Sequence, residues 1–189
     1  MGKPLSVLLI EDSEEDTLLL LRELLRFGYE VKFERVETDI AMRAMLSEGE
    51  WDLILSDYTL PKFSAPQALE TLKASGLDIP FIIISGTIGE ETAVAALKAG
   101  ANDFLIKGKY ARLGLAIERE LGEAKLRRER NQAEEQIKYH ARLLQHINDA
   151  VIATDNQFRI TAWNRAAEKI YGWIATEVMG RSVDEVLSS

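Results

Sequence analysis

The chain has 189 residues and a net charge of -8, from 23 basic and 31 acidic side chains. Hydrophobic residues make up 47% and charged residues 29%, a balance typical of globular proteins, and the length suits one domain and part of a second. The absence of cysteine excludes disulfides and thiolate chemistry. No apolar run approaches the roughly 20 residues of a membrane span and no signal peptide is recognisable, so we expect a cytoplasmic protein without a membrane partner. The acidic excess lies in residues 1–110, which argues against direct binding of nucleic acid there.

Short apolar runs alternate with longer amphipathic segments through about residue 120. Almost wholly apolar runs of this length predict strands that are covered on both faces. The five expected strands are Leu5–Ile10, Val31–Val36, Leu53–Ser56, Phe81–Ile84 and Asp103–Ile106. The second alternates apolar and polar residues, which is typical of an edge strand.

The segments between these strands carry helix signals. Ser13 is expected to cap the first helix, with Asp16 three residues later as in a capping box, and Thr38 to cap the second. Pro66 suits the first turn of the third helix. Glycines are expected to end the four helices: Gly28, Gly49, Gly76 and Gly100. Alternating strands and helices predict an α/β domain with a flavodoxin-like (βα)5 doubly wound parallel sheet, strand order 2-1-3-4-5.

A long helical segment is expected from about Tyr110 to Ile147, with two apolar stripes. The first stripe is fit to pack on the sheet as its fifth helix: Leu113, Ile117, Leu121 and Ala124. The second has the spacing of a coiled-coil seam: Ala133, Ile137, His140, Leu144 and Ile147. The two stripes are out of phase between Leu121 and Leu126, so we expect a stutter or kink there. The second stripe predicts a connector that pairs with a second copy, and a solvated single helix is the alternative.

After residue 148 the pattern changes to short β-like and helical pieces. The runs 150–154 and 159–163 predict a hairpin. Asn164 can cap a short helix that ends at Gly172, and brief helical turns are expected over 176–179 and 183–187. These residues are too few to enclose a core alone, so we expect the chain to stop inside a partial α+β domain.

Polar side chains stand where the predicted strands end. Glu11 and Asp12 follow the first strand and Asp57 the third, while Ser85 and Lys107 follow the fourth and fifth. Because the carboxyl ends of parallel strands meet at one edge of a sheet, we expect these groups to converge. Three bare carboxylates would raise each other's pKa, and a hard divalent cation such as Mg²⁺ relieves this. The pattern predicts Asp57 as a nucleophile toward a phosphoryl donor, with Lys107 and Ser85 stabilising the transferring group. Unrelated surface acids are the alternative.

Residues 5–120 resemble the receiver domain of two-component response regulators. The resemblance is carried by Val7–Ser13, Leu55–Pro61, Ile79–Gly86 and Gly100–Lys107. It implies Asp57 as the phosphoacceptor, and a histidine kinase or phosphotransfer protein as partner. It implies Mg²⁺ ligands at Glu11, Asp12, Asp57 and the backbone carbonyl of Thr59. Ser85 and Phe104 would be the switch residues, and Phe104 would turn inward on phosphorylation. Without the resemblance, Phe104 is better interpreted as a core aromatic.

Two residues depart from the receiver pattern. Gly108 stands where the family usually has a proline after the lysine, often with a cis peptide, so we expect a trans bond and a looser loop. Ala65 stands near a position where the family favours glycine, so that turn is expected to differ. Neither departure touches the predicted chemistry.

Residues 147–189 resemble the N-terminal portion of a PAS sensor domain. The matching segments are Ile147–Asp155, Ile160–Ala167, Tyr171–Trp173 and Glu177–Gly180. PAS domains bind haem, flavins, small metabolites or nothing, so the resemblance leaves the ligand unknown. Trp163, Tyr171 and Trp173 either line a pocket or, as we favour, pack in the core.

We predict three parts: a receiver domain over residues 1–122, a helical linker over 123–146 that could form a short coiled coil, and the PAS portion over 147–189. The leading interpretation is a phosphorylation-dependent signalling module rather than an enzyme. It would relay the state of Asp57 through helix 4, strand 5, helix 5 and the linker to the PAS or output region, as a homodimer through that face or the linker. The alternatives are a receiver that no longer switches and serves as a dimerisation module, and a Mg²⁺-dependent phosphohydrolase. Such a hydrolase commonly needs a second acid where Thr59 stands.

Overall fold

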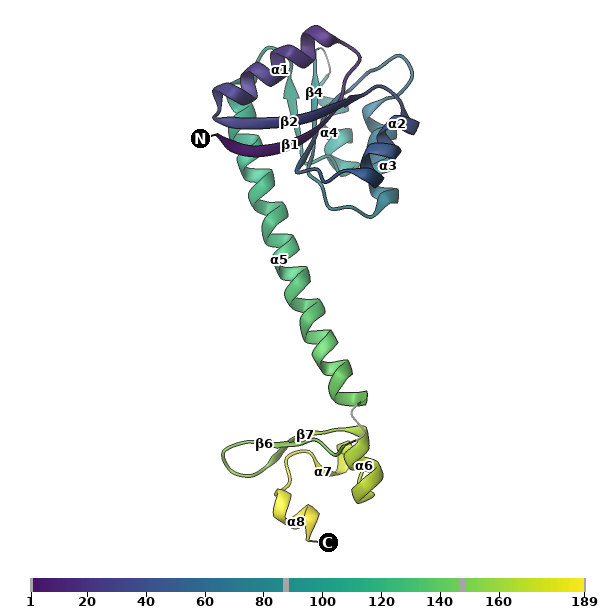
Figure 1. The fold of residues 1–189 in the computed structure, drawn as a ribbon, viewed down its shortest axis with the longest axis vertical. Coiled ribbons are helices and arrows are strands. Elements are labelled where there is room, and N and C mark those ends of the chain that lie inside the picture. The colour runs from purple at the N-terminus through teal and green to yellow at the C-terminus, as the bar shows by residue number, and fades with distance from the viewer. Residues whose placement is uncertain (1, 87–88, 147–148, 189) are drawn as a thin grey trace. The chain divides into compact units, whose positions relative to one another are not determined.

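The computed structural model describes the backbone of residues 2–86, 89–146 and 149–188, and their side chains except those of residues 90 and 140–146. The chain divides into two compact units, Met1–Arg128 and Glu129–Ser189. A five-stranded sheet forms the centre of the first unit, and a two-stranded sheet lies in the second (Figure 1). Among the described residues, no helix is both long enough and apolar enough to cross a membrane.

The sheet of the first unit is parallel and has the order β2-β1-β3-β4-β5. Its strands are β1 (Lys3–Ile10), β2 (Tyr29–Val36), β3 (Leu53–Asp57), β4 (Phe81–Ser85) and β5 (Asp103–Ile106). The predicted doubly wound fold is therefore confirmed, and β2 lies at an edge as its alternating pattern indicated. Strand β4 is buried along its whole length, in agreement with its apolar sequence.

Helices follow the strands where the capping signals predicted them. They are α1 (Glu14–Arg26), α2 (Asp39–Glu48), α3 (Ala65–Ser75), α4 (Glu90–Lys98) and α5 (Leu113–His146), with a short 3₁₀ turn, η1 (Tyr110–Arg112), before the last. The Ser13 and Thr38 side chains accept hydrogen bonds from backbone N–H groups in the first turns of α1 and α2. Gly76 adopts a left-handed conformation at the end of α3, which a residue with a side chain rarely adopts.

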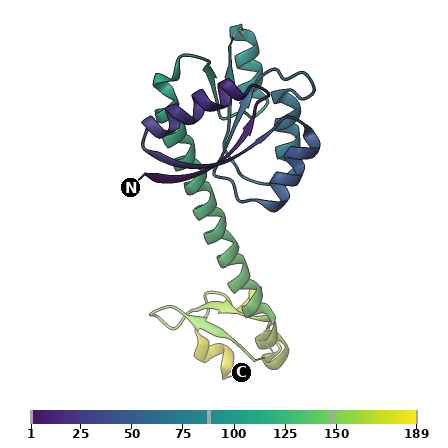
Figure 2. The same cartoon turned by 45° about the horizontal axis from the view of Figure 1, so that its top comes forward.

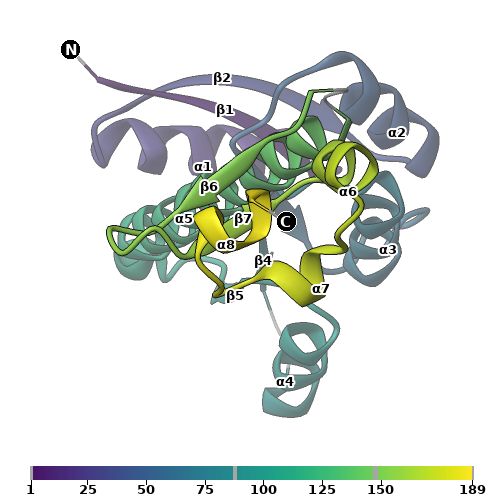
Figure 3. The same cartoon turned by 90° about the horizontal axis from the view of Figure 1, so that it is seen from below.

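The helices cover both faces of the sheet. Figure 3 shows α1 and α5 on one side of the strands and α2 and α3 on the other, and the same layers can be followed in Figure 2. Strand β1 explains the division, because Val7 and Leu9 join the apolar core under α1 and α5 while Leu8 and Ile10 join the core under α2 and α3. Only Ala96 of α4 is buried among its described side chains, so this helix is less firmly packed than the others.

Helix α5 continues without a break through residues 121–126, where we expected a stutter or kink. Its first apolar stripe is buried as predicted, with Leu113 and Ile117 fully covered and Leu121 packed against the same core. In the second stripe Ile137 is 70% exposed. The side chains of His140, Leu144 and Ile147 lie outside the described residues. The structure of one chain therefore leaves the pairing of this stripe as a prediction.

The second unit contains the predicted hairpin, β6 (Ile152–Thr154) and β7 (Ile160–Trp163), which pair antiparallel. The helices that follow are α6 (Arg165–Tyr171), α7 (Ala175–Val178) and α8 (Val183–Leu187). Asn164 caps α6 as expected, and Gly172 ends it in a left-handed conformation. Trp163 is buried in a small apolar cluster, and its indole N–H donates to the carbonyl of Trp173 over 3.0 Å. This contact favours core packing for Trp163 over a pocket-lining role.

Candidate functional site

The predicted strand-end groups do converge at the carboxyl edge of the parallel sheet. Asp57 is the last residue of β3, and its neighbour Ser56 pairs with Ile10, the residue before Glu11. Ser85 ends β4 and pairs with Ile106, the residue before Lys107. The parallel register therefore aligns four strand ends, β1, β3, β4 and β5, and brings their polar residues to one edge.

Three carboxylates form a cluster at this edge. Oxygen atoms of Glu11, Asp12 and Asp57 all lie within 4.8 Å of one another. Glu11 is only 2% exposed, whereas Asp12 is exposed to solvent. Carboxylate oxygens gathered on an open edge are the ligands that Mg²⁺ prefers, since it takes few protein ligands and keeps water and phosphate oxygens. The donor set therefore fits a magnesium ion.

Lys107 supplies positive charge beside these acids. Its Nζ lies 2.9 Å from Glu11 Oε2, 2.9 Å from Asp57 Oδ2 and 2.5 Å from Asp16 Oδ2. An ammonium group has three donors, so each one has a carboxylate partner here. Burial lowers the pKa of Lys107, but its bonds to Asp16, Asp57 and Glu11 outweigh that effect and raise the pKa above its usual value. The lysine is therefore charged across the physiological range.

Glu11 is held in position by hydrogen bonds to both its side chain and its backbone carbonyl. Burial raises the pKa of its carboxyl, and hydrogen bonds from Lys107 and from the backbone N–H of Ser13 counteract the burial. The Ser13 N–H lies 3.0 Å from Glu11 Oε1. The Arg35 side chain, from the edge strand β2, donates to the backbone carbonyls of Glu11 and Asp12 over 3.2 and 3.1 Å. These contacts fix the segment that carries two of the three acids.

Both carboxylate oxygens of Asp57 are engaged. Oδ1 accepts a hydrogen bond of 2.6 Å from the backbone N–H of Tyr58, and Oδ2 accepts from Lys107. The Asp57 side chain is 14% exposed, so solvent still reaches the carboxylate. A fixed, accessible carboxylate with a cation at one oxygen is oriented for attack on an electrophile that approaches from solvent.

The remaining predicted site residues lie around this cluster. Ser85 is 5% exposed at the end of β4, and its carbonyl accepts from the Lys107 backbone N–H over 2.8 Å. Phe104 on β5 is partly buried against the core under α2, α3 and α4. Thr59 is exposed in the loop after β3, where it forms an isolated antiparallel bridge with Ser64. Gly108 adopts a positive φ of 81°, and no cis peptide occurs among the described residues.

Asp16 lies at the site although its spacing from Ser13 predicted a role in capping α1. We expected its carboxylate to complete a capping box with Ser13, yet the Ser13 N–H bonds to Glu11 and the Asp16 carboxylate pairs with Lys107. The capping bond from the Asp16 N–H to Ser13 Oγ, 3.2 Å long, is present as expected. The bond to the Ser13 side chain is therefore predicted correctly. The reciprocal bond from the Ser13 N–H to the Asp16 carboxylate is absent, and that carboxylate makes a tertiary contact with Lys107 instead.

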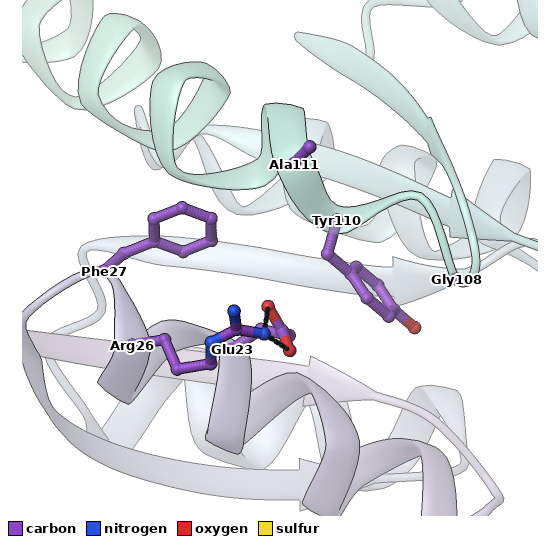
Figure 4. Close-up of a pocket in the computed structure, with 6 residues that line it drawn as sticks. All are labelled: Glu23, Arg26, Phe27, Gly108, Tyr110 and Ala111. Carbon is purple, nitrogen blue, oxygen red and sulfur yellow. Dashed lines mark hydrogen bonds and ion pairs between the residues drawn. The ribbon is translucent and has the colours of Figure 1, made fainter.

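A separate hollow of about 380 Å³ lies between the end of α1 and the turn after β5. Its lining consists of Glu23, Arg26, Phe27, Gly108, Tyr110 and Ala111 (Figure 4). Arg26 pairs with Glu23 over 2.8 Å, and the Tyr110 hydroxyl points away from that pair. None of the clustered acids lines the hollow, so it is distinct from the acidic site.

Comparison with known proteins assigns both units. Residues 7–117 match the family described as the response regulator receiver domain, and residues 139–189 match the PAS fold. The swarming motility regulation protein RssB of Serratia marcescens is 37% identical over 103 residues, which are 54% of this chain and 46% of RssB. The transcriptional regulatory protein ZraR of Salmonella typhimurium is 36% identical over 101 residues, 53% of this chain and 22% of ZraR. The chain thus spans less than half the length of these two relatives.

Solved structures agree with the family match. The signal receiver domain of a putative LuxO repressor protein from Vibrio parahaemolyticus has a TM-score of 0.59 and 27% identity, over 66% of this chain and 95% of that one. The receiver domain of the sensor histidine kinase PA1611 from Pseudomonas aeruginosa, with a magnesium ion coordinated in its active-site cleft, has a TM-score of 0.54 and 27% identity, over 65% and 99% of the two chains. With its parallel sheet, its acidic edge and a match over 7–117, this chain belongs to the response regulator receiver domain family.

Proposed function

We propose that this chain is a phosphorylation-dependent signalling module, because receiver domains are phosphoacceptor signalling modules rather than enzymes. They bind Mg²⁺ at an acidic site and interact with histidine kinases or phosphotransfer proteins. These statements describe the family to which residues 7–117 belong. The roles of individual residues in this chain are proposed from the geometry of its acidic site.

We propose that Asp57 accepts a phosphoryl group from a phosphohistidine of a histidine kinase or phosphotransfer protein. An Asp57 carboxylate oxygen forms the new O–P bond as the N–P bond of the donor breaks, which yields an acyl phosphate and a free histidine side chain. The observation that carries this proposal is the 2.9 Å contact between Lys107 Nζ and Asp57 Oδ2, beside a carboxylate cluster within 4.8 Å. This contact supports the proposal, because the Lys107 ammonium group would offset the negative charge that gathers on the phosphoryl group during transfer.

The other residues have complementary roles in this proposal. The side chains of Glu11, Asp12 and Asp57 and the carbonyl of Thr59 would hold Mg²⁺, which supplies positive charge against the phosphoryl oxygens. Lys107 donates to a phosphoryl oxygen once Asp57 is modified. Ser85, buried at the end of the neighbouring strand β4, donates its hydroxyl to another of these oxygens.

The response to phosphorylation is proposed to involve α4, β5 and α5. Helix α4 is anchored by Ala96 alone among its described side chains, so a small change at the strand ends can move it at low cost. Val94, Leu97 and Ile106 expose apolar surface on α4 and β5, at 44%, 42% and 44%. We propose that Ser85 and Phe104 shift on phosphorylation, that this apolar surface changes, and that a homodimer forms through it, through the linker, or both.

The proposed division of the chain follows from these roles. The receiver domain occupies residues 1–122, a helical linker 123–146 carries its state onward, and a PAS portion 147–189 receives it. The ligand of the PAS portion stays unknown, and the cytoplasmic location expected from the sequence stays a prediction. If phosphorylation controls pairing, the phosphate mimic beryllofluoride raises the dimer fraction, and an equal fraction with and without it contradicts the relay.

Incubation with acetyl phosphate and Mg²⁺, followed by intact mass measurement, tests the phosphoacceptor role. We expect one added phosphoryl group, which is lost in Asp57→Asn and absent when EDTA removes the metal. Turnover of acetyl phosphate without an adduct would indicate a phosphohydrolase instead. No reaction at all would indicate a receiver that serves only as a dimerisation module. The hydrolase is disfavoured because Thr59 offers no acidic proton beside the nucleophile.

A further inference from the structure

The three partners of Lys107 fall into two groups. Glu11 and Asp57 belong to the carboxylate cluster that suits Mg²⁺. Asp16 does not belong to that cluster, yet it accepts the shortest of the three hydrogen bonds, 2.5 Å from Nζ to Oδ2. Any cation that occupies the oxygens of Glu11 and Asp57 competes with Lys107 for them. Asp16 is then the one partner of the three that Lys107 keeps.

Asp16 is held firmly enough to serve as such a partner. Its backbone N–H donates to Ser13 Oγ over 3.2 Å in the first turn of α1. The next residue, Thr17, donates its hydroxyl to the Ser13 carbonyl over 2.9 Å and is itself buried. The Asp16 side chain is 34% exposed, and it pairs with Lys107. The position of the carboxylate is therefore fixed by a capped helix end and not by the lysine alone.

We infer that Asp16 is a positioning residue that offers Lys107 an alternative carboxylate partner. The lysine can then leave the metal-binding oxygens of Glu11 and Asp57 and still be paired. With Asp16 in place, the ammonium group stays at the carboxyl edge of β5, close to the phosphoryl position, while Glu11 and Asp57 become available to Mg²⁺. Without Asp16, Lys107 can be satisfied only by Glu11 and Asp57, and it competes with the metal for both. This inference rests on the proposed metal site and adds a residue outside the ligand set.

The inference predicts a specific change in metal affinity. Asp16→Asn weakens Mg²⁺ binding, measured by calorimetry with Mg²⁺ alone and no phosphodonor, by about three- to fivefold beyond the effect of charge loss. Glu15→Gln is the matched control for charge, because Glu15 is exposed in the same first turn of α1. Like Asp16→Asn, it removes one negative charge near the positive end of the helix dipole. Its effect on Mg²⁺ affinity is expected to be small.

A double-mutant cycle separates positioning from general electrostatics. Lys107→Met removes the competing cation and is expected to tighten Mg²⁺ binding. In that background Asp16→Asn has no lysine to release, so its effect should fall to that of Glu15→Gln. Thermal unfolding of each variant verifies that the domain is folded before binding is compared.

The outcomes are distinct. If Asp16→Asn loses more Mg²⁺ affinity than Glu15→Gln, and this excess disappears in the Lys107→Met background, the role of Asp16 as the alternative partner of Lys107 is supported. Equal losses in Asp16→Asn and Glu15→Gln overturn it, as does an excess that persists unchanged without the lysine. A wild-type chain that binds no Mg²⁺ overturns the metal site itself and this inference with it. A wild-type chain that binds Mg²⁺ while the two variants behave alike overturns the inference alone.

Discussion

The two halves of helix α5 have similar apolar periodicity and very different surroundings. In the first half, Leu113 and Ile117 are fully buried in the core they share with α1 and the sheet. In the second half, Ile137 is 70% exposed and its described neighbours are exposed as well. Polar and charged side chains separate the halves, with Arg130 pairing with Glu134 along the helix surface over 2.8 Å. One helix thus carries a buried apolar stripe followed by a second stripe whose described members, Ala133 and Ile137, are exposed.

The difference shows what an apolar stripe does and does not specify. A stripe indicates that a helix face needs a covering surface, because burying a side chain such as Ile gains about 1.5–3 kcal/mol. It does not indicate whether the surface comes from the same chain. For the first half, the sheet supplies it. For the second half, the spacing of four and three residues favours a second copy of the helix, which would supply an equivalent stripe.

The largest expected effect comes from the same substitution made in each half. Ile117→Ala is expected to cost the receiver domain about 2–5 kcal/mol, since Ile117 is 0% exposed and its truncation leaves a cavity. Ile137→Ala is expected to change the free energy of unfolding of the dilute monomer by less than about 0.5 kcal/mol, because the Ile137 side chain is already exposed to water. Urea unfolding followed by circular dichroism measures both. Similar losses in the two variants would mean that the halves do not differ as described.

Sequence patterns predicted the receiver fold well because its signals are local and repeated. The run Leu53–Ser56 is apolar on both faces and ends in a polar residue, and Ser13 and Thr38 cap helices through bonds within one turn. One error lies at an element end, because β2 begins at Tyr29, two residues earlier than predicted. Pairing with β1 extends that strand, and a partner strand cannot be seen from a single segment.

The candidate site was predictable where a strand end decides the position of a side chain. Glu11, Asp57 and Lys107 come together because parallel register fixes their backbones. Asp16 was assigned to the helix cap because its spacing from Ser13 suits both roles. The capped helix end positions Asp16, but its carboxylate partner is Lys107, 91 residues away in sequence. Contacts of this kind depend on tertiary geometry and leave no local pattern.

An intermediate effect is expected on self-association. If the second stripe pairs with its copy, Ile137→Ala removes apolar surface from both helices and raises the dimer dissociation constant by about tenfold or more. Gln132→Ala is the control, since Gln132 is exposed and lies off the stripe. Sedimentation equilibrium of the full chain measures both. An unchanged constant in Ile137→Ala would favour the solvated single helix.

The smallest expected effect concerns the point where α5 leaves the receiver unit. Arg127 donates to both carboxylate oxygens of Asp78, over 2.9 and 3.3 Å, and Arg128 donates to the Asp78 carbonyl over 2.9 Å. The Arg127 and Asp78 side chains are 42% and 40% exposed, so Asp78→Asn is expected to cost under about 1 kcal/mol of global stability. Its effect should instead be local, with faster amide hydrogen exchange in α5 near residue 128, because these contacts tie the helix to the loop before β4.

Glu134→Gln, which removes a comparable pair within the helix, should leave exchange near residue 128 unchanged. Equal exchange in the two variants would mean that the buried stripe ending at Ala124, and not the Asp78 contacts, sets where the anchored half of α5 ends.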